Sequence, residues 1–176
     1  MKVGELCTLK ETDLIEKNDG NFSLSITKTY YNPTNNIRSF QLVTPKTLSS
    51  RRIIDIDNLV VGCIKSVLER NKEIKKIARE EYYDIFVNNG TYPGYPLYIK
   101  LIEQRMARLL KLCGLNESLT PHSLRHTHTS LLAEAEASLE SIMERLGHSD
   151  DDITKKVYLH TTEAVEKEMP KSSEIS

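Results

Sequence analysis

Between residues 120 and 160 the chain gathers side chains that can bind and attack a phosphate group. His122 and Arg125 lie three residues apart, His148 follows, and Tyr158 comes ten residues later. Residues three apart share one face of a helix. An arginine fork matches phosphate oxygens, an imidazole adds a further donor, and a tyrosine hydroxyl can attack the phosphorus. The pattern predicts phosphoryl transfer by a tyrosine.

The same residues have ordinary structural interpretations, which the sequence leaves open. An arginine and a histidine near a helix start are often an ion-paired side chain and a cap, and most tyrosines pack rather than react. His122 and His126 also have the i,i+4 spacing of zinc-binding helices. No glutamate stands between them in the metalloprotease arrangement, and the cysteines lack zinc-ligand spacing. We therefore expect neither a metal nor another cofactor.

The composition fits one ordinary globular domain of 176 residues, with 39% hydrophobic and 28% charged residues. The formal net charge of −1 counts against nucleic-acid binding, which usually leaves a basic footprint. Clustering matters more than the total, however. Lys46, Arg51 and Arg52 stand close together, so we expect them to contact DNA.

The cysteines and the absence of targeting signals indicate the compartment. Cys7, Cys63 and Cys113 are odd in number and widely spaced among apolar residues, as expected of buried, reduced thiols in the cytoplasm. No apolar run approaches the ~18 residues of a membrane span, and no signal peptide opens the chain. We expect a soluble cytoplasmic protein with no membrane partner.

Apolar periodicity predicts an α+β domain that is mostly helical. Thr120-Pro121 is a strong helix start and Gly147 a stop signal. The expected strands, which should form one antiparallel sheet of three with Lys46 at the last turn, are 22–26, 40–43 and 52–56. The expected helices are 57–81, 97–113, one from Thr120 with Leu124, Leu131, Leu132 and Ala135 on its buried side, 139–146 and 153–162.

Apolar periodicity and composition also predict how the two ends of the chain are organised. Helical spacing is already under way at Val3 and Leu6 with no cap before it, so we expect a fragment boundary with more protein upstream. Residues 1–166 are expected to form the domain, and residues 167–176 a polar tail.

Several motifs in order resemble the catalytic signature of the tyrosine recombinases, the phage and transposon integrases. The interval of 23 residues from Arg125 to His148 and of ten more to Tyr158 fits that family. The resemblance covers essentially the whole chain, as a catalytic domain without its first helix and without a separate DNA-clamping domain. The motifs are Thr-Pro-His122-x-x-Arg125-His, Leu-Gly-His148, Tyr158-x-His160, Gly4-Glu5-Leu6, and Thr44-Pro-Lys46-Thr followed by Arg51-Arg52.

The resemblance implies a role for each residue of the site. Tyr158 would be the nucleophile, and Arg125 would clamp the non-bridging oxygens of the scissile phosphate. His122 would donate or shuttle a proton there, and His148 would hydrogen-bond the same phosphate as charge builds up. Lys46 would protonate the leaving 5′ oxygen.

One position departs from the family pattern. The family places an arginine three residues before the glutamate that matches Glu5, and this chain has Lys2. Lysine keeps the charge but loses the planar fork. Losing such a clamp costs about a hundredfold or more in rate, so we expect DNA binding to survive and cleavage to be impaired.

The function implied is site-specific integration and excision of a mobile element through a 3′-phosphotyrosyl intermediate, in a bacterial or phage-infected cell. The partners implied are double-stranded DNA attachment sites, a homotetramer on that DNA, and accessory DNA-bending or excision factors. The alternative is a catalytically silent DNA-binding or regulatory derivative of the same fold, which Lys2 motivates.

Overall fold

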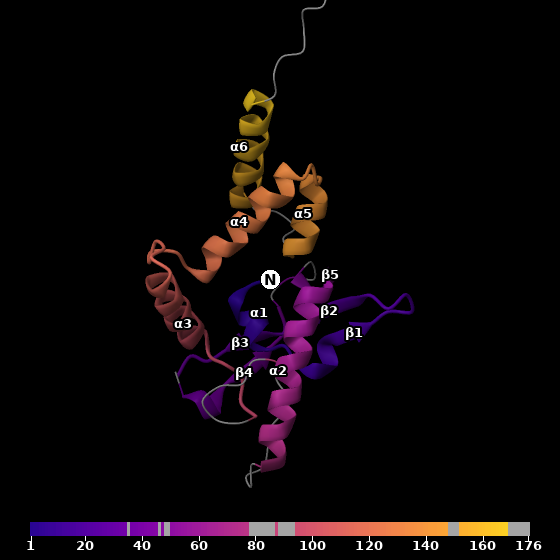
Figure 1. Ribbon diagram of the computed structural model, residues 1–176, viewed down its shortest axis with the longest axis vertical. Coiled ribbons are helices and arrows are strands. Elements are labelled where there is room, and N and C mark those ends of the chain that lie inside the picture. Colours follow the sequence, from indigo (N-terminus) through magenta and orange to yellow (C-terminus); the bar gives the residue numbers. More distant parts are fainter. Residues whose placement is uncertain are drawn as a thin grey trace, which may run out of the picture.

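The computed structural model describes residues 1–34, 36–45, 47, 50–77, 87, 94–147 and 152–168, with residues 37 and 163–168 as backbone only. Its elements divide between two hydrophobic clusters. Figure 1 shows the strands with α1, α2 and α3 in one part of the molecule, and α4, α5 and α6 together in the other. Predictions for Lys46, His148, the helix end at 78–81 and the tail at 169–176 lie outside the described residues.

A three-stranded antiparallel sheet has the order β1-β2-β5, and a two-stranded sheet pairs β3 with β4. Leu24 in β2 lies opposite Leu14 in β1 and Ile54 in β5, so apolar side chains share one face. In the second sheet Tyr30 pairs with Leu42. The strands are β1 (Leu14–Glu16), β2 (Phe22–Ile26), β3 (Thr29–Tyr31), β4 (Gln41–Val43) and β5 (Arg52–Ile56).

The predicted sheet of three strands is present, but one of its members was predicted wrongly. The strand at 40–43 pairs with β3 in a separate sheet, and β1 takes the third place instead. Both missed strands, β1 and β3, are only three residues long. A strand that short shows too little alternation to stand out from a turn.

The first cluster lies between the three-stranded sheet and α2 (Asn58–Ile77), where Leu24, Ile26 and Ile54 pack with Ile64 and Leu68. The second lies among α4 (Pro121–Glu134), α5 (Leu139–Leu146) and α6 (Asp152–Glu168), the last longer than predicted. The remaining helices are α1 (Val3–Cys7) and α3 (Ile99–Leu112). None of the described helices is long and apolar enough to cross a membrane.

Helix α4 begins as predicted, with Thr120 as the N-cap residue and Pro121 in the first turn. Of the four residues predicted on its buried side, Leu132 packs against the second cluster, whereas Ala135 is exposed. Leu124 and Leu131 are exposed, and the face turned inward carries Arg125, Thr129 and Ala133, which follow each other at four-residue steps. The inward face of α4 therefore holds a charged side chain rather than a leucine row.

The prediction of three buried thiols holds for one cysteine only. Cys7, the last residue of α1, is fully buried, and desolvation raises the pKa of its thiol to about 12. Cys63 on α2 and Cys113 at the end of α3 are exposed. Apolar neighbours in sequence did not indicate burial here, because both lie on the outward faces of their helices.

Candidate active site

Arg125 on α4 is buried, with 8% of its surface exposed, and it is fixed to the end of α5. Its Nη2 donates a hydrogen bond of 2.7 Å to the backbone carbonyl oxygen of Leu146. The last carbonyls of a helix have no partner within the helix, and positive charge is favourable there. Arg125 therefore stabilises the C-terminus of α5, and α5 in turn fixes the direction of the guanidinium.

Two more side chains reach the same helix end from the loop before β5 and from its first residue. Arg52 donates from Nε to the carbonyl of Arg145 at 2.8 Å, and the Ser50 hydroxyl donates to the carbonyl of Gly147 at 3.4 Å. We call the carbonyls of Arg145, Leu146 and Gly147 the carbonyl frame. Its three members accept from Ser50, Arg52 and Arg125, all of which lie far from the frame in the sequence, and the frame ends one residue before His148.

Helix α1 holds Arg52 in turn. The guanidinium of Arg52 donates to both carboxylate oxygens of Glu5, at 3.0 and 3.2 Å, and the two side chains are 5% and 2% exposed. Burial alone would raise the pKa of the Glu5 carboxyl. The hydrogen bonds from Arg52 and from the backbone amide of Lys2 outweigh it and hold that pKa below its ordinary value.

This placement gives Arg52 a different role from the one that the basic cluster indicates. Its side chain is enclosed by Glu5, the carbonyl frame and Ser50, so its guanidinium is directed into the protein rather than toward solvent. Arg51, the neighbouring residue, is exposed. Of the two, only Arg51 has the accessibility that a phosphate contact requires.

His122 is exposed on the first turns of α4, and its Nδ1 lies 3.0 Å from Nε2 of His126, one turn later. The two rings are tilted, with centroids 4.7 Å apart. His128 lies on another side of α4, where Arg145 donates to its Nε2 at 3.3 Å. Desolvation and the nearby Arg145 charge lower the pKa of His128. His122 therefore remains open to solvent, whereas His128 is a neutral acceptor within the fold.

Tyr158 on α6 is half-buried and packs against the cluster of Ala133, Ile142 and Leu146. Leu146 belongs to the cluster against which Tyr158 packs, and its backbone carbonyl accepts from Arg125. Helix α6 makes its most extensive contacts with α4. The structure therefore places Arg125 and Tyr158 at the same group of helices, α4, α5 and α6.

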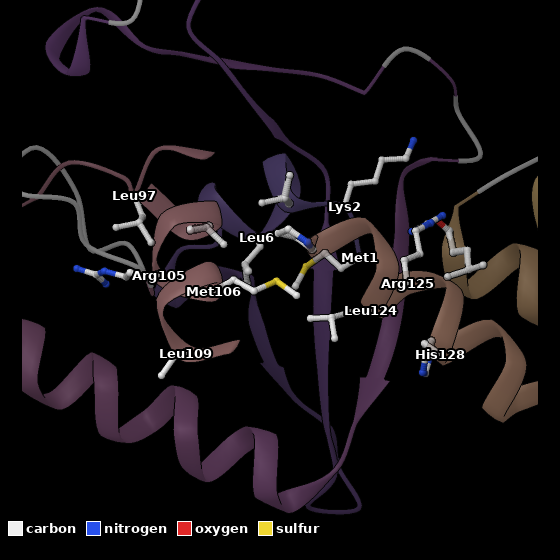
Figure 2. Close-up of a pocket in the computed structure, with 14 residues that line it drawn as sticks. Met1, Lys2, Leu6, Leu97, Arg105, Met106, Leu109, Leu124, Arg125 and His128 are labelled. Carbon is white, nitrogen blue, oxygen red and sulfur yellow. The ribbon is translucent and has the colours of Figure 1, made fainter. Parts of the chain in front are cut away.

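A cavity of about 460 Å³ opens beside Arg125, between α1, α3 and α4. Its walls are mostly apolar, and its cations are Lys2, Arg105 and Arg125. Figure 2 shows Lys2 and Arg125 on one side of this hollow, with Met106 and Leu109 of α3 opposite. Lys2 itself is exposed at the N-cap of α1. Lys2 and Arg125 therefore line one cavity, although they lie 123 residues apart in the chain.

Lys46 and His148, the other two predicted site residues, lie outside the described residues. Sequence reasoning missed the contributions of Ser50 and Arg145, and it noted Glu5 only as part of a motif. No local signal could reveal them, since Glu5 and Arg52 are 47 residues apart and Arg52 and Arg145 are 93 apart. Gly147 gave a partial signal as a helix stop, and a β-carbon there would lie 2.6 Å from Nη1 of Arg52.

The sequence matches the model of the phage integrase family over residues 1–164. It is 33% identical to the integrase of Staphylococcus phage L54a, over 99% of this chain and 48% of that protein. It is 30% identical to the tyrosine recombinase XerD of Staphylococcus haemolyticus, over 96% of this chain and 60% of that protein. The chain thus spans about half the length of the curated relatives it matches.

Solved structures share the fold. The Tn1549 transposon integrase, in complex with transposon right end DNA, superposes with a TM-score of 0.74 at 23% identity, covering 95% of this chain and 54% of that one. The XerA recombinase gives a TM-score of 0.64 at 21% identity, covering 95% of this chain and 50% of that one. The prediction of a tyrosine-recombinase catalytic fold is confirmed. With a family match over 164 of its 176 residues, this chain belongs to the phage integrase family.

Proposed function

We propose that this chain is the catalytic domain of a site-specific recombinase that integrates and excises a mobile element. Residues 1–166 would form this domain and 167–176 a tail. Family membership supports the reaction class. The single observation that carries the site assignment is the buried Arg125, which donates to the backbone carbonyl of Leu146, a member of the cluster against which Tyr158 packs.

In the proposed reaction the Tyr158 hydroxyl attacks a DNA phosphodiester. A bond forms between phosphorus and the tyrosine oxygen, and the bond to the 5′ oxygen breaks. Arg125 binds the non-bridging oxygens, with His122 and His148 as further donors. Lys46 gives the leaving 5′ oxygen its proton, and the phenol proton passes to a neighbouring imidazole. One ester replaces another, so a 5′ hydroxyl from a partner strand can reverse the step without ATP.

The proposed partners are double-stranded DNA attachment sites, with four copies of the protein joined on two duplexes. Solved relatives support DNA as the ligand, since the Tn1549 integrase structures hold transposon right end DNA and circular intermediate DNA. Arg51 and Lys46 are the proposed DNA contacts. Accessory bending or excision factors and a cytoplasmic location in a bacterial or phage-infected cell complete the proposal.

Lys2 favours a second candidate, a DNA-binding derivative that does not cleave. A lysine ammonium is a point charge and cannot form the two parallel hydrogen bonds of an arginine fork on a phosphate. Lys2 is exposed and lines the same cavity as Arg125, so a side chain at this position can reach a ligand held there.

The experiment is covalent trapping on a nicked duplex that carries the element's attachment core. The chain, Tyr158→Phe and Lys2→Arg are each mixed with it, and adducts that survive denaturant are counted. Tyr31→Phe is the matched control, since Tyr31 is an exposed tyrosine on β3. We expect adducts from Tyr31→Phe and more from Lys2→Arg than from the unchanged chain, and none from Tyr158→Phe.

Adducts that persist in Tyr158→Phe would overturn the choice of nucleophile. If every version binds DNA with the salt dependence of phosphate contacts and none attaches, the silent derivative becomes the better description. Because phenylalanine keeps the ring that packs against α4 and α5, loss of the adduct in Tyr158→Phe will not reflect unfolding.

A further inference from the structure

The contact between His122 and His126 places two ring nitrogens at a spacing that one metal ion can bridge. The two side chains lie one turn apart on α4, and the nitrogens that face each other, Nδ1 and Nε2, are 3.0 Å apart. The pair stands on an exposed edge, with His122 open to solvent and His126 half-buried. Without a metal, the same distance is that of a hydrogen bond between the two rings.

Coordination geometry selects the kind of ion. Metal–imidazole bonds are about 2.0–2.1 Å long, so two such bonds at a right angle place their nitrogens about 3.0 Å apart. A tetrahedral angle would require about 3.4 Å. Right angles are the preference of Ni²⁺ and Cu²⁺ with nitrogen and oxygen ligands. We propose that His122 Nδ1 and His126 Nε2 form a two-imidazole site for Ni²⁺ or Cu²⁺.

The rest of the coordination shell would be water. Among the residues that the structure describes, no group of three histidine, cysteine or acidic side chains could hold an ion. His160 on α6 lines a recess of about 440 Å³ together with His126, yet it does not join such a group. The site is therefore open, and it binds an ion from solution reversibly rather than enclosing a structural one.

Binding requires one proton to move and none to be lost. In the hydrogen bond, one of the two facing nitrogens carries the proton between the rings. When the metal takes both facing nitrogens, that proton shifts through water to the far nitrogen of the same ring, and both imidazoles stay neutral. His122 is then fixed with its proton on Nε2 and cannot pass a proton to His126. This consequence for cleavage rests on the proposed function, whereas the metal site itself does not.

The test is titration of Ni²⁺ into the untagged protein, followed by calorimetry and by NMR of the histidine rings. Ni²⁺ is the probe because Cu²⁺ oxidises thiols, and Cys63 and Cys113 are exposed. The variants are His126→Gln and His122→Gln. His160→Gln is the matched control, an exposed histidine on the same recess.

We expect the His122 and His126 signals to broaden first, at Ni²⁺ below one equivalent, and Ni²⁺ affinity to fall about tenfold or more in either variant. His160→Gln should bind as the unchanged chain does. Equal affinity in His126→Gln, or broadening centred on His160 or His128, would overturn the site. Inhibition of adduct formation by Ni²⁺, reversed by a chelator, is a separate readout. A chain that binds Ni²⁺ at this pair but never attaches to DNA would refute the proposed function and leave the metal site standing.

Discussion

Arg125 and Leu146 are 21 residues apart in the chain and are joined by a buried hydrogen bond of 2.7 Å from Nη2 to the backbone carbonyl. A guanidinium donates five hydrogen bonds from a rigid plane. When one N–H of that plane is bound to a helix end, the directions of the remaining N–H donors are also fixed. The carbonyl frame thus sets the orientation of Arg125. Substitutions around the frame can be tested by measuring protein stability, without any DNA.

Replacing Glu5 should destabilise the fold strongly. Glu5→Gln leaves the buried guanidinium of Arg52 without its counter-charge, and breaking a buried ion pair costs about 3–5 kcal/mol. The control is Glu11→Gln, which breaks the exposed pair with Lys72 and should cost less than about 1 kcal/mol. Urea unfolding followed by circular dichroism measures both. Similar losses in the two variants would contradict the role assigned to Glu5.

The same ion pair makes stability depend on acidity. The pKa of Glu5 is lower in the fold than its ordinary value of 4.5, so the carboxylate contributes its full stabilisation above that value. The contribution disappears as the pH falls through the folded-state pKa. We expect the difference in unfolding free energy between the unchanged chain and Glu5→Gln to shrink below pH 4.5. If this difference in unfolding free energy stays constant on acidification, the charge of Glu5 does not contribute to stability.

A side chain at Gly147 should destabilise the fold for two separate reasons. Its φ of +72° is left-handed, and a β-carbon would lie 2.6 Å from Nη1 of Arg52. Gly114, which also follows a helix, has a φ of +65° and open space around it. Gly114→Ala should cost about 1 kcal/mol from backbone strain alone, and Gly147→Ala at least about 1 kcal/mol more from displacing Arg52. Thermal unfolding measures the loss of stability in both variants. Equal losses would mean that the Arg52 side chain moves aside without cost.

Arg125→Lys should separate binding from cleavage. A lysine keeps the positive charge but cannot bond the carbonyl frame and a phosphate in one plane, so adduct formation should fall about a hundredfold or more. DNA affinity should change much less. Arg108→Lys on the exposed side of α3 is the control and should leave both unchanged. Gel-shift and trapping assays on the same DNA distinguish the two effects, and a parallel fall in both would indicate loss of the fold.

Thiol labelling should distinguish the cysteines. Cys7 is fully buried, and its pKa of about 12 leaves almost no thiolate at mildly alkaline pH, whereas Cys63 and Cys113 are exposed. Iodoacetamide should therefore modify two thiols in the folded protein and all three in denaturant, as counted by mass spectrometry. Rapid modification of Cys7 in the folded protein would show that the packing beneath α1 opens readily.

The fold class and the order of the site motifs could be predicted because both are local properties of the sequence. The helix from Thr120, the stop at Gly147 and the strands at Phe22–Ile26 and Arg52–Ile56 follow from caps and alternation. The inward face of α4 could not be predicted. Apolar periodicity assigns burial to leucines, whereas this face carries Arg125, whose partner is a distant backbone carbonyl.

The basic cluster at Arg51 and Arg52 shows the same limit. Adjacent arginines in a sequence indicate a surface patch, yet alternation along a strand sends neighbours to opposite sides. Arg51 is exposed and Arg52 meets Glu5 in the interior. A residue's partner at a separation of 47 positions is a property of the assembled fold, so no local pattern could have chosen between the two.

The carbonyl frame joins segments that lie far apart in the chain. Its donors come from β5, the loop before it and α4, its acceptors from the end of α5, and its counter-charge from α1. Arg125 itself needs only the end of α5, since its printed acceptor is the carbonyl of Leu146. A chain truncated before α5 would therefore carry Arg125 without that acceptor. Docking of α5 against α4 is thus the part of folding that fixes the direction of the guanidinium.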